Sequence, residues 1–342
     1  MFSRTSLRRC SILAAGLFCL GAWQPVFGVP VEPLYVIGRD ENNKTMKTKL
    51  STDFPDPALV QGDDGIWYSF ATNANGKNIQ VAKASQISGS WELLDNDALP
   101  DVGWATGANT WAPDVRKLDN GSFIMYYSGE VKEGGGRHCI GVGISDVITG
   151  PYKPTREPWV CPFADGGAID AAGYFDEPTR KRYVLYKVDG NNIGNGGDCN
   201  NGIEPLVPTP IMLQEVEADG ISKIGDPVEI LDRTDDDGPL VEAPDLVRTE
   251  EGLYILFFSS FCFNSENYNV NYATSRNISG PYQRPSRKLL QTGDFNLTAP
   301  GGATSVKGGG QMLFHSDCPE TAPQRCLYQT TYSVTGRDLI IS

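Results

Sequence analysis

The chain has 342 residues, with 42 acidic against 29 basic side chains and a formal net charge of −13. So acidic a protein repels nucleic acids and anionic membrane surfaces, and neither is expected as a partner. With only 2 histidines and no Cys-x-x-Cys pair, the composition also argues against the usual zinc sites.

The first 28 residues have the pattern of a secretory signal. Three arginines precede an apolar run of 14 residues, CSILAAGLFCLGAW, and small residues follow in QPVFG. The run is too short to span a bilayer comfortably, so a membrane anchor is the weaker interpretation. We therefore expect residues 1–28 to be cleaved as a signal peptide. Residues 29–342 are expected to form a single secreted, extracellular, monomeric domain.

The cysteines and glycosylation sequons agree with export. Six cysteines remain after residue 28, and an even number in a secreted protein predicts three disulfides among fifteen possible pairings. Cys318 with Cys326 is the easiest local closure. Four Asn-x-Ser/Thr sequons fit a glycosylating secretory route. They are Asn43, Asn120, Asn277 and Asn296.

Short strands separated by turns recur along the chain, and no long segment has helical periodicity. Five similar segments begin at PDPALVQGDDGIWYSF (55–70), PDVRKLDNGSFIMYYS (113–128), IDAAGYFDEPTRKRYVLY (169–186), PDLVRTEEGLYILFFS (244–259) and APGGATSVKGGGQMLFHS (299–316). Each reads as a short strand, a polar turn and a second strand with aromatic residues. The aligned acidic residues are Asp56, Asp114, Asp170 and Asp245, with Gly301 in the fifth copy.

A second motif closes three of these units, ending at Trp91, Tyr152 and Tyr282. Five units of roughly 60 residues, each made of a few antiparallel strands, predict an all-β, five-bladed β-propeller. The alternative is a β-sandwich with a second all-β domain. The Gly- and Asn-rich stretch 189–208 is predicted to be a long loop tied down by Cys199.

In a propeller the equivalent strand starts surround one axis, so the repeated Asp positions should converge. Two of the copies, WAPDVR (111–116) and EAPDLVR (242–248), differ in their first letter. At the same place, three residues before the aligned Asp, the first copy has Asp53 and the third copy has Gly167. With no G-x-S-x-G elbow, acid–base chemistry falls to carboxyl groups, which can cleave a glycosidic bond as a pair.

These residues carry a resemblance to glycoside hydrolase family 43, five-bladed propellers that hydrolyse arabinan, xylan and related chains. The motifs are FPDPALV (54–60), TWAPDVRKL (110–118), AIDAAGYFDE (168–177) and VEAPDLV (241–247), in the family's order and at blade spacing. The resemblance implies Asp56 as the general base, Glu242 as the general acid, and Asp170 as the residue that modulates the pKa of the acid and orients it. Because the family inverts configuration, Asp56 and Glu242 are expected about 6.5–9.5 Å apart.

The chain also departs from the family pattern. Ala171 follows Asp170 where members usually have Pro, and Pro300-Gly301-Gly302 stands where many members carry an axial His that serves a metal ion. The second departure argues against an axial calcium ion, and the chemistry requires no cofactor. His315 is expected to be structural.

The remaining site residues have both structural and functional interpretations. Asp114 and Asp245 are expected to bond backbone amides rather than to act in catalysis. Trp104 and Trp111 are candidates for a sugar-stacking platform, with blade packing as the alternative.

The sequence therefore predicts a secreted, inverting glycoside hydrolase of plant cell-wall pentose polymers, of the α-L-arabinofuranosidase or arabinanase type. A β-D-xylosidase of the same family is the first alternative. A retaining fructosidase is a weaker one, because no WMNDPNG-like motif occurs and its carboxyl groups would have to lie about 5–5.5 Å apart. A non-catalytic carbohydrate-binding propeller is the alternative from another class.

Overall fold

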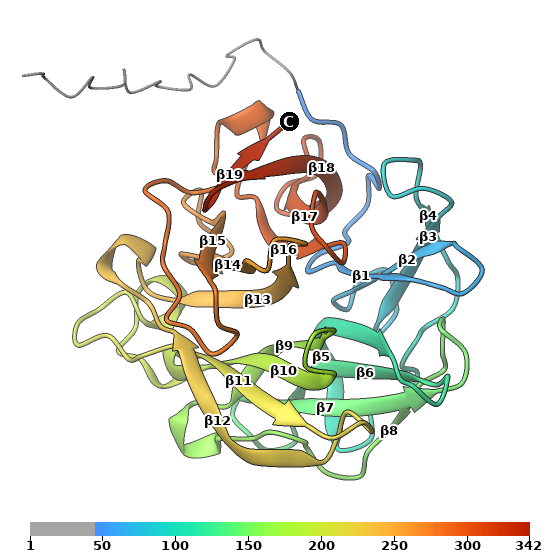
Figure 1. Ribbon diagram of the computed structural model, residues 1–342. Helices are drawn as coiled ribbons and strands as arrows, with labels where there is room; N and C mark the ends of the chain where they lie inside the picture. The colour runs from blue at the N-terminus through green and yellow to red at the C-terminus, as the bar shows by residue number, and fades with distance from the viewer. Residues whose placement is uncertain (1–44) are drawn as a thin grey trace, which may run out of the picture. The chain divides into compact units, whose positions relative to one another are not determined.

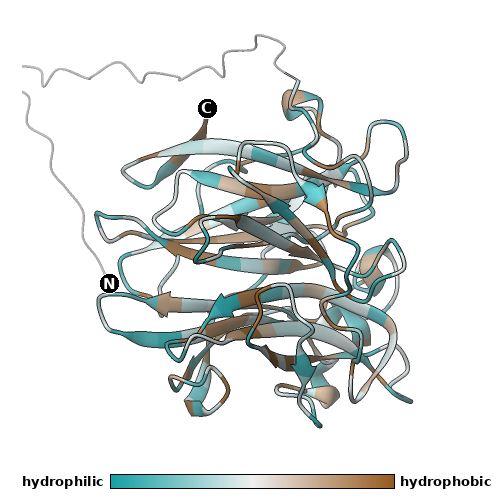
Figure 2. Cartoon of the chain, turned by 90° about the vertical axis from the view of Figure 1, so that its right-hand side faces the viewer, coloured by the Kyte–Doolittle hydropathy of each residue, from teal (hydrophilic) through white to brown (hydrophobic). Residues whose placement is uncertain are grey.

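The computed structural model describes residues 45–342, and the predicted signal peptide lies outside them. The described residues form five antiparallel sheets arranged as the blades of a propeller (Figure 1). This confirms the predicted all-β, five-bladed fold. In Figure 2 brown, apolar segments lie mainly along the strands, as expected when blades pack face to face.

The strands follow one another from the axis outward within each sheet. The first sheet contains β1 (Ala58–Gln61), β2 (Trp67–Ala71), β3 (Gln80–Ala84) and β4 (Glu92–Leu93). The second contains β5 (Ala105–Lys117), β6 (Phe123–Val131), β7 (His138–Ser145) and β8 (Lys153–Pro154). The third contains β9 (Ala168–Asp176), β10 (Lys181–Val188), β11 (Ile211–Val216) and β12 (Lys223–Leu231). The fourth contains β13 (Val241–Arg248), β14 (Tyr254–Ser260) and β15 (Asn269–Ser275). The fifth contains β16 (Gly301–Ser305), β17 (Gln311–Asp317), β18 (Arg325–Thr335) and β19 (Asp338–Ile341).

Five short 3-10 helices lie in loops of the described residues. They are η1 (Phe163–Asp165), η2 (Gly190–Ile193), η3 (Asp198–Asn200), η4 (Asp235–Asp237) and η5 (Asp294–Asn296). No helix within residues 45–342 has the length and apolar character needed to cross a bilayer.

The second strand of each blade supplies much of the core. Phe70, Tyr127, Phe257 and Phe314 are fully buried there. Burying each such side chain stabilises the fold by roughly 1.5–3 kcal/mol. The aromatic signature in the sequence therefore reports packing between blades.

The repeat is confirmed, but its predicted alignment is wrong by two residues in the second and fourth copies and by one residue in the fifth, where Gly302 takes the place expected for Gly301. Near the axis, each blade has one residue with positive φ at the start of its inner strand. They are Asp56 (54°), Ala112 (40°), Asp170 (59°), Ala243 (52°) and Gly302 (58°). A β-bulge accompanies this residue in the second to fifth blades.

The misalignment has a simple cause in the sequence. The dipeptide Pro-Asp occurs in three copies and invites alignment, whereas the backbone aligns Asp56-Pro57 with Ala112-Pro113 and Ala243-Pro244. Asp114 and Asp245 therefore lie two residues beyond the level of Asp56 and Asp170. It also follows that Trp111 and Glu242 correspond to Pro55, Ile169 and Gly301, and not to Asp53 or Gly167.

A ring of polar side chains around the axis links neighbouring blades by hydrogen bonds. At or near its C-terminal end, the second strand of each blade carries one of the triplets FAT, YYS, LYK, FFS and LFH. Their last residues are Thr72, Ser128, Lys187, Ser259 and His315. The backbone N–H groups of Ala112, Asp170, Gly302 and Asp56 donate to Thr72 Oγ1, Ser128 Oγ, Ser259 Oγ and His315 Nδ1 at 2.9–3.0 Å. In the remaining blade Lys187 has no lone pair to offer, and the N–H of Ala243 donates to Asp170 Oδ2 at 2.9 Å.

Segments near both ends of the described chain meet in the fifth blade. The N–H of Lys49 donates to the carbonyl of Leu327 on β18, and the N–H of Phe54 donates to the carbonyl of Arg325, both at 2.7 Å. Leu50 and Leu327 form an antiparallel bridge. The sequence left the closure of the ring open, and these bonds close it.

Three disulfides join Cys139 to Cys161, Cys199 to Cys262 and Cys318 to Cys326. Their number and the local closure of Cys318 with Cys326 are as predicted, and the sequence left the other two pairings open. The long loop between β10 and β11 carries η2 and η3. Its predicted tether is confirmed, because Cys199 binds Cys262 just after β14. This tether fixes the loop beside the start of the fourth blade.

Candidate active site

The starts of the five inner strands surround a narrow axial cavity of about 40 Å³. Asp56, Asp114, Asp170 and Asp245 all line it, so the predicted convergence of four carboxyl groups is observed. Glu242 precedes Ala243, another residue of this lining. The positive-φ residue at each strand start turns the backbone so that its neighbours face the axis.

Asp56 is held in a strongly polar environment. Arg325 Nη1 donates to Oδ1 at 3.2 Å, and the Thr72 hydroxyl donates to Oδ2 at 2.6 Å. Burial alone would raise the pKa of Asp56, but the Arg325 charge and the Thr72 hydrogen bond outweigh burial and lower it. The carboxyl group is therefore ionised at neutral pH, which is the form a general base needs.

His315 is fully buried and holds the backbone of Asp56. The N–H of Asp56 donates to Nδ1 at 3.0 Å, so the neutral ring carries its proton on Nε2. Burial, together with the nearby Arg325 charge, lowers the pKa of His315 to about 3. The histidine has a structural contact, as predicted, and that contact is with the candidate base.

The axial calcium ion of related propellers does not fit these residues. A side chain on Gly302 would meet the His315 ring at 2.8 Å, and one on Gly301 would meet the Tyr268 ring at 2.0 Å. His315 offers no lone pair to a metal ion, because Nδ1 accepts the N–H of Asp56 and the unpartnered Nε2 of the neutral ring then carries the proton. Within residues 45–342 no three His, Cys, Asp or Glu side chains gather as a metal-binding group.

Asp170 belongs to the third blade and contacts the fourth. Its backbone N–H donates to Ser128, and its Oδ2 accepts from the N–H of Ala243. Burial raises the pKa of Asp170 well above its usual range, and the negative charges of Glu242 and Asp56 raise it further. A negative charge on Glu242 therefore makes ionisation of Asp170 less favourable.

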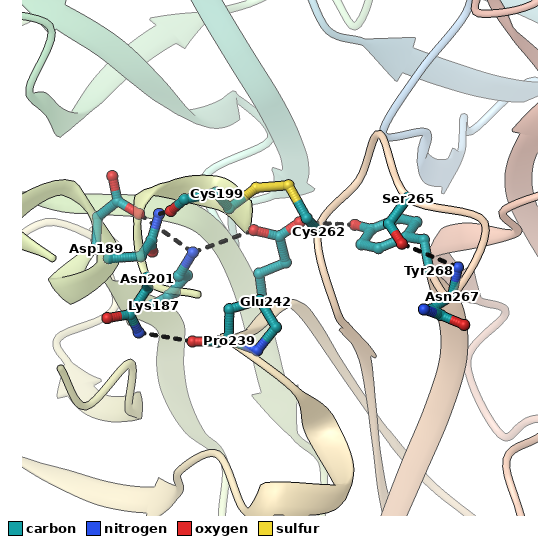
Figure 3. Close-up of a disulfide and its surroundings, with 11 residues drawn as sticks. Lys187, Asp189, Cys199, Asn201, Pro239, Glu242, Cys262, Ser265, Asn267 and Tyr268 are labelled. Carbon is teal, nitrogen blue, oxygen red and sulfur yellow. Dashed lines mark hydrogen bonds and ion pairs between the residues drawn. A yellow bond between two sulfur atoms is a disulfide. The ribbon is translucent and has the colours of Figure 1, made fainter. Parts of the chain in front are cut away.

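Glu242 is clamped from two sides (Figure 3). Lys187 Nζ lies 3.1 Å from Oε2, and the Tyr268 hydroxyl donates to Oε1 at 2.9 Å. Lys187 is fully buried and lies 3.1 Å from Asp189 Oδ1 as well. The Glu242 side chain is 12% exposed, so the clamp leaves it only a small opening to solvent.

Asp114 and Asp245 join blades, as their structural interpretation predicts. Each accepts a backbone N–H of the next blade at 2.8 Å, from Gly173 and Ser305 respectively. Arg116 lies between them, with Nε 2.8 Å from Asp114 and Nη2 3.3 Å from Asp245. Neither carboxyl contacts the clamp around Glu242.

The two tryptophans differ in their surroundings. Trp104 stacks on Tyr127 and packs against the core between the first two blades. Trp111 stacks on His138 with ring centroids 3.6 Å apart and keeps part of its surface exposed. It occupies the position in its blade that Glu242 occupies in the fourth, so of the two it is the better placed for a sugar.

Sequence reasoning did not identify Lys187, Tyr268, Arg325 or Thr72 as parts of this site. A signal for Lys187 was present, because LYK breaks a series of triplets that otherwise end in Ser, Thr or His. Arg325 carries no such signal, since its contact with Asp56 spans 269 positions and depends on ring closure. Chemically, the site offers one ionised carboxylate, Asp56, and two further carboxyl groups, Asp170 and Glu242, of which Asp170 has a raised pKa. Carboxyl groups in such different environments can support acid–base hydrolysis.

Comparisons with known proteins agree with this chemistry. The family model described as glycosyl hydrolases family 43 matches residues 49–342. A probable arabinan endo-1,5-alpha-L-arabinosidase C from Aspergillus flavus is 26% identical over 286 residues, covering 77% of this chain and 82% of the relative. A probable arabinan endo-1,5-alpha-L-arabinosidase A from the same organism is 34% identical over 266 residues, covering 76% and 73%.

Solved structures share the fold. A thermostable family-43 glycoside hydrolase has a TM-score of 0.72 at 24% identity and covers 85% of this chain and 93% of its own. An endo-arabinase from Bacteroides thetaiotaomicron has a TM-score of 0.66 at 17% identity, covering 86% and 99%. Together with the family match, the comparisons establish that the chain belongs to glycosyl hydrolases family 43 and is a glycosidase that hydrolyses O-glycosyl compounds.

Proposed function

We propose that the protein hydrolyses α-1,5-linked L-arabinan with inversion of configuration, using Asp56 as general base and Glu242 as general acid. The observation that carries the proposal is the contrast between these two carboxyl groups. Arg325 and Thr72 lower the pKa of Asp56, whereas Glu242 lies between Lys187 and Tyr268, beside an Asp170 whose pKa is raised. Two carboxyl groups in such different environments are suited to opposite roles.

In the proposed reaction, Asp56 takes a proton from a water molecule as its oxygen attacks the anomeric carbon. The bond from that carbon to the glycosidic oxygen breaks, and its electron pair stays on the oxygen. Glu242 delivers its proton to that oxygen, so the products are two neutral sugars. Asp56 then releases its proton to solvent and Glu242 regains one. The 6.5–9.5 Å separation expected for inversion stays a prediction.

Asp170 has two proposed roles in this scheme. Through Oδ2 it fixes the N–H of Ala243, which orients the adjacent Glu242. Two buried carboxylates also repel each other, so ionisation of one of the two carboxyl groups favours retention of the proton on the other. Trp111 is proposed to contact a sugar ring and Trp104 to support that wall.

The choice of arabinan is supported by the relatives, since the Aspergillus proteins above carry arabinan in their names. An extracellular endo-α-(1→5)-L-arabinanase 1 from Bacillus subtilis is 26% identical over 271 residues, covering 74% of this chain and 77% of the relative. Its name also supports endo action and secretion, which we propose for this chain. Asn120, Asn277 and Asn296 are exposed, as glycan acceptors must be.

Product analysis on linear arabinan and on xylan, with the anomers resolved by NMR, tests the proposal. We expect short α-1,5-arabino-oligosaccharides of inverted configuration from arabinan and no products from xylan. Xylose or xylo-oligosaccharides would make the protein a xylan-active member of the family. Binding of either oligosaccharide without cleavage would favour the non-catalytic alternative.

A further inference from the structure

The ring of interblade hydrogen bonds has one cationic member. At four of its five positions a hydroxyl or an imidazole nitrogen accepts the N–H of the next blade. Lys187 occupies the fifth position and cannot accept a hydrogen bond. A serine there would serve the fold as it does in the neighbouring blades, so packing alone does not call for a lysine.

Two consequences follow from the lysine, and both concern the reacting carboxyl groups. Asp170 replaces the missing acceptor by taking the N–H of Ala243 on Oδ2. The ammonium group instead contacts Glu242 Oε2 at 3.1 Å. A buried cation needs such partners, and burying Lys187 without them would be costly.

From this geometry we propose that Lys187 is a positioning residue that stabilises the carboxylate left on Glu242 as its proton passes to the leaving oxygen. The inference rests on the proposed role of Glu242 as general acid. While Glu242 is protonated, the ammonium group faces a neutral carboxyl group. As the proton leaves, a full negative charge develops 3.1 Å from a fixed cation.

The second partner of Lys187 holds the cation in place. Asp189 Oδ1 lies 3.1 Å from Nζ, and Asp189 is itself fixed by a backbone bond to Gly167. Lys187 is fully buried, so the ammonium group has no competing water shell at the surface. Its charge is therefore preorganised, which is the condition for it to favour the transition state.

The charged and titratable groups around Glu242 have opposing effects on a negative charge at its carboxyl group. Lys187 from β10 favours the carboxylate, and Tyr268, which precedes β15, donates a hydrogen bond to it. Asp170 from β9 and Glu242 repel each other when both are ionised, and the charge of Asp56 also acts on Asp170. Lys187 offsets the repulsion that a carboxylate on Glu242 meets from Asp170.

The test uses aryl glycosides of α-1,5-arabinotriose that differ in leaving group. An activated 2,4-dinitrophenolate departs without protonation, whereas an unactivated phenolate needs the acid. Lys187→Met should lower kcat/KM about 30-fold on the phenyl glycoside and at most about threefold on the dinitrophenyl glycoside. The alkaline limb of its pH profile should move upward by about one pH unit, because Glu242 holds its proton more firmly without the cation.

Lys187→Arg keeps the charge and should leave the alkaline limb in place. Lys181→Met is the matched control, because Lys181 lies on the same strand and pairs with a glutamate, Glu215, at the surface. It should behave as the parent protein does. An equal loss on both aryl glycosides in Lys187→Met, with an unmoved pH profile, would assign Lys187 to structure alone.

Glu242→Gln separates this inference from the proposed function. If Glu242→Gln is equally impaired on both glycosides, Glu242 is not the acid and the proposed function is wrong. If Glu242→Gln shows the leaving-group dependence and Lys187→Met does not, only the Lys187 inference is overturned.

The double variant Lys187→Met/Asp189→Asn guards against misfolding, because it removes a cation and an anion together. It should reproduce the leaving-group dependence of Lys187→Met. If Lys187→Met, the double variant and Lys187→Arg all fail to fold, Lys187 is required for stability and the inference is overturned.

Discussion

The strands β5 and β13 begin with almost the same sequence, WAPDVR and EAPDLVR, and with the same backbone. Ala112 and Ala243 both have positive φ, and a β-bulge follows each. The Asp two residues later, Asp114 or Asp245, accepts an N–H of the next blade in both. Everything the two copies share therefore builds the propeller.

What differs is the residue before the alanine and the blade that faces it. Trp111 stacks on a histidine, whereas Glu242 is clamped by Lys187 and Tyr268. The N–H of Ala112 is taken by the Thr72 hydroxyl, and that of Ala243 by a carboxylate, Asp170. The comparison teaches that the shared Asp belongs to the scaffold, and that the residues proposed for chemistry and sugar contact, Glu242 and Trp111, stand three positions before it.

The largest expected effect distinguishes Glu242 from Trp111, the residues with which the two similar sequences begin. Glu242→Gln should lower kcat on arabinan by about 10³-fold, because it removes the proposed proton donor to the leaving oxygen. Trp111→Phe keeps an aromatic face and should cost at most about tenfold, mainly in KM. Steady-state kinetics on linear arabinan measure both effects, with circular dichroism as the check on folding. A larger loss in Trp111→Phe than in Glu242→Gln would reverse the comparison.

Much of the scaffold that the two strands share was predictable from the sequence, because turns and aromatic strands recur at regular spacing. The fold, the blade count and the pairing of Cys318 with Cys326 follow from such local patterns. The register did not follow, since Pro-Asp reads alike at Asp56 and at Asp114 although the backbone places them at different levels. Only φ values and bulges distinguish the two levels.

The candidate site was predicted in part. Asp56, Asp170 and Glu242 come from motifs, and the structure gathers their strand starts around one axis. The partners that set their charge were missed, because each partner lies on another strand or another blade. Lys187 in YVLYKV has the appearance of an ordinary strand residue until the five triplets are aligned. Tyr268 and Arg325 reach the site only through the folded ring.

A smaller effect is expected at Asp245, the aspartate of the fourth blade that corresponds to Asp114 of the second. Burial raises the pKa of Asp245 to about 6 despite the Arg116 charge. Its folded pKa thus exceeds the unfolded value of about 3.9, so the native state binds more protons between these limits and stability falls as pH rises from 4 to 6. The ionised, buried form costs on the order of 3 kcal/mol above pH 6.

Asp245→Asn should remove this fall, which urea unfolding at pH 4, 5, 6 and 7 would measure against the parent protein. Asp114 lies closer to Arg116, at 2.8 Å against 3.3 Å, so Asp114→Asn should change the pH dependence less. Identical pH slopes in the parent and in Asp245→Asn would show that the carboxyl group does not titrate in this range.

The smallest expected effects test whether the backbone at Ala112 is equivalent to the backbone at Ala243. Ala112→Gly and Ala243→Gly each relieve a left-handed alanine, which is disfavoured by roughly 1 kcal/mol, and each adds freedom to the unfolded chain, which offsets roughly half of that gain. Both variants should therefore be stabilised by about 0.5 kcal/mol, equally within error, in chemical unfolding. Their activities should differ, because Ala243 adjoins Glu242 and a glycine there loosens the orientation of the acid. We expect about a threefold loss of kcat in Ala243→Gly and none in Ala112→Gly. Equal activities would mean that Lys187 and Tyr268 alone orient Glu242, while unequal stabilities would contradict the shared backbone on which the comparison of the two strands depends.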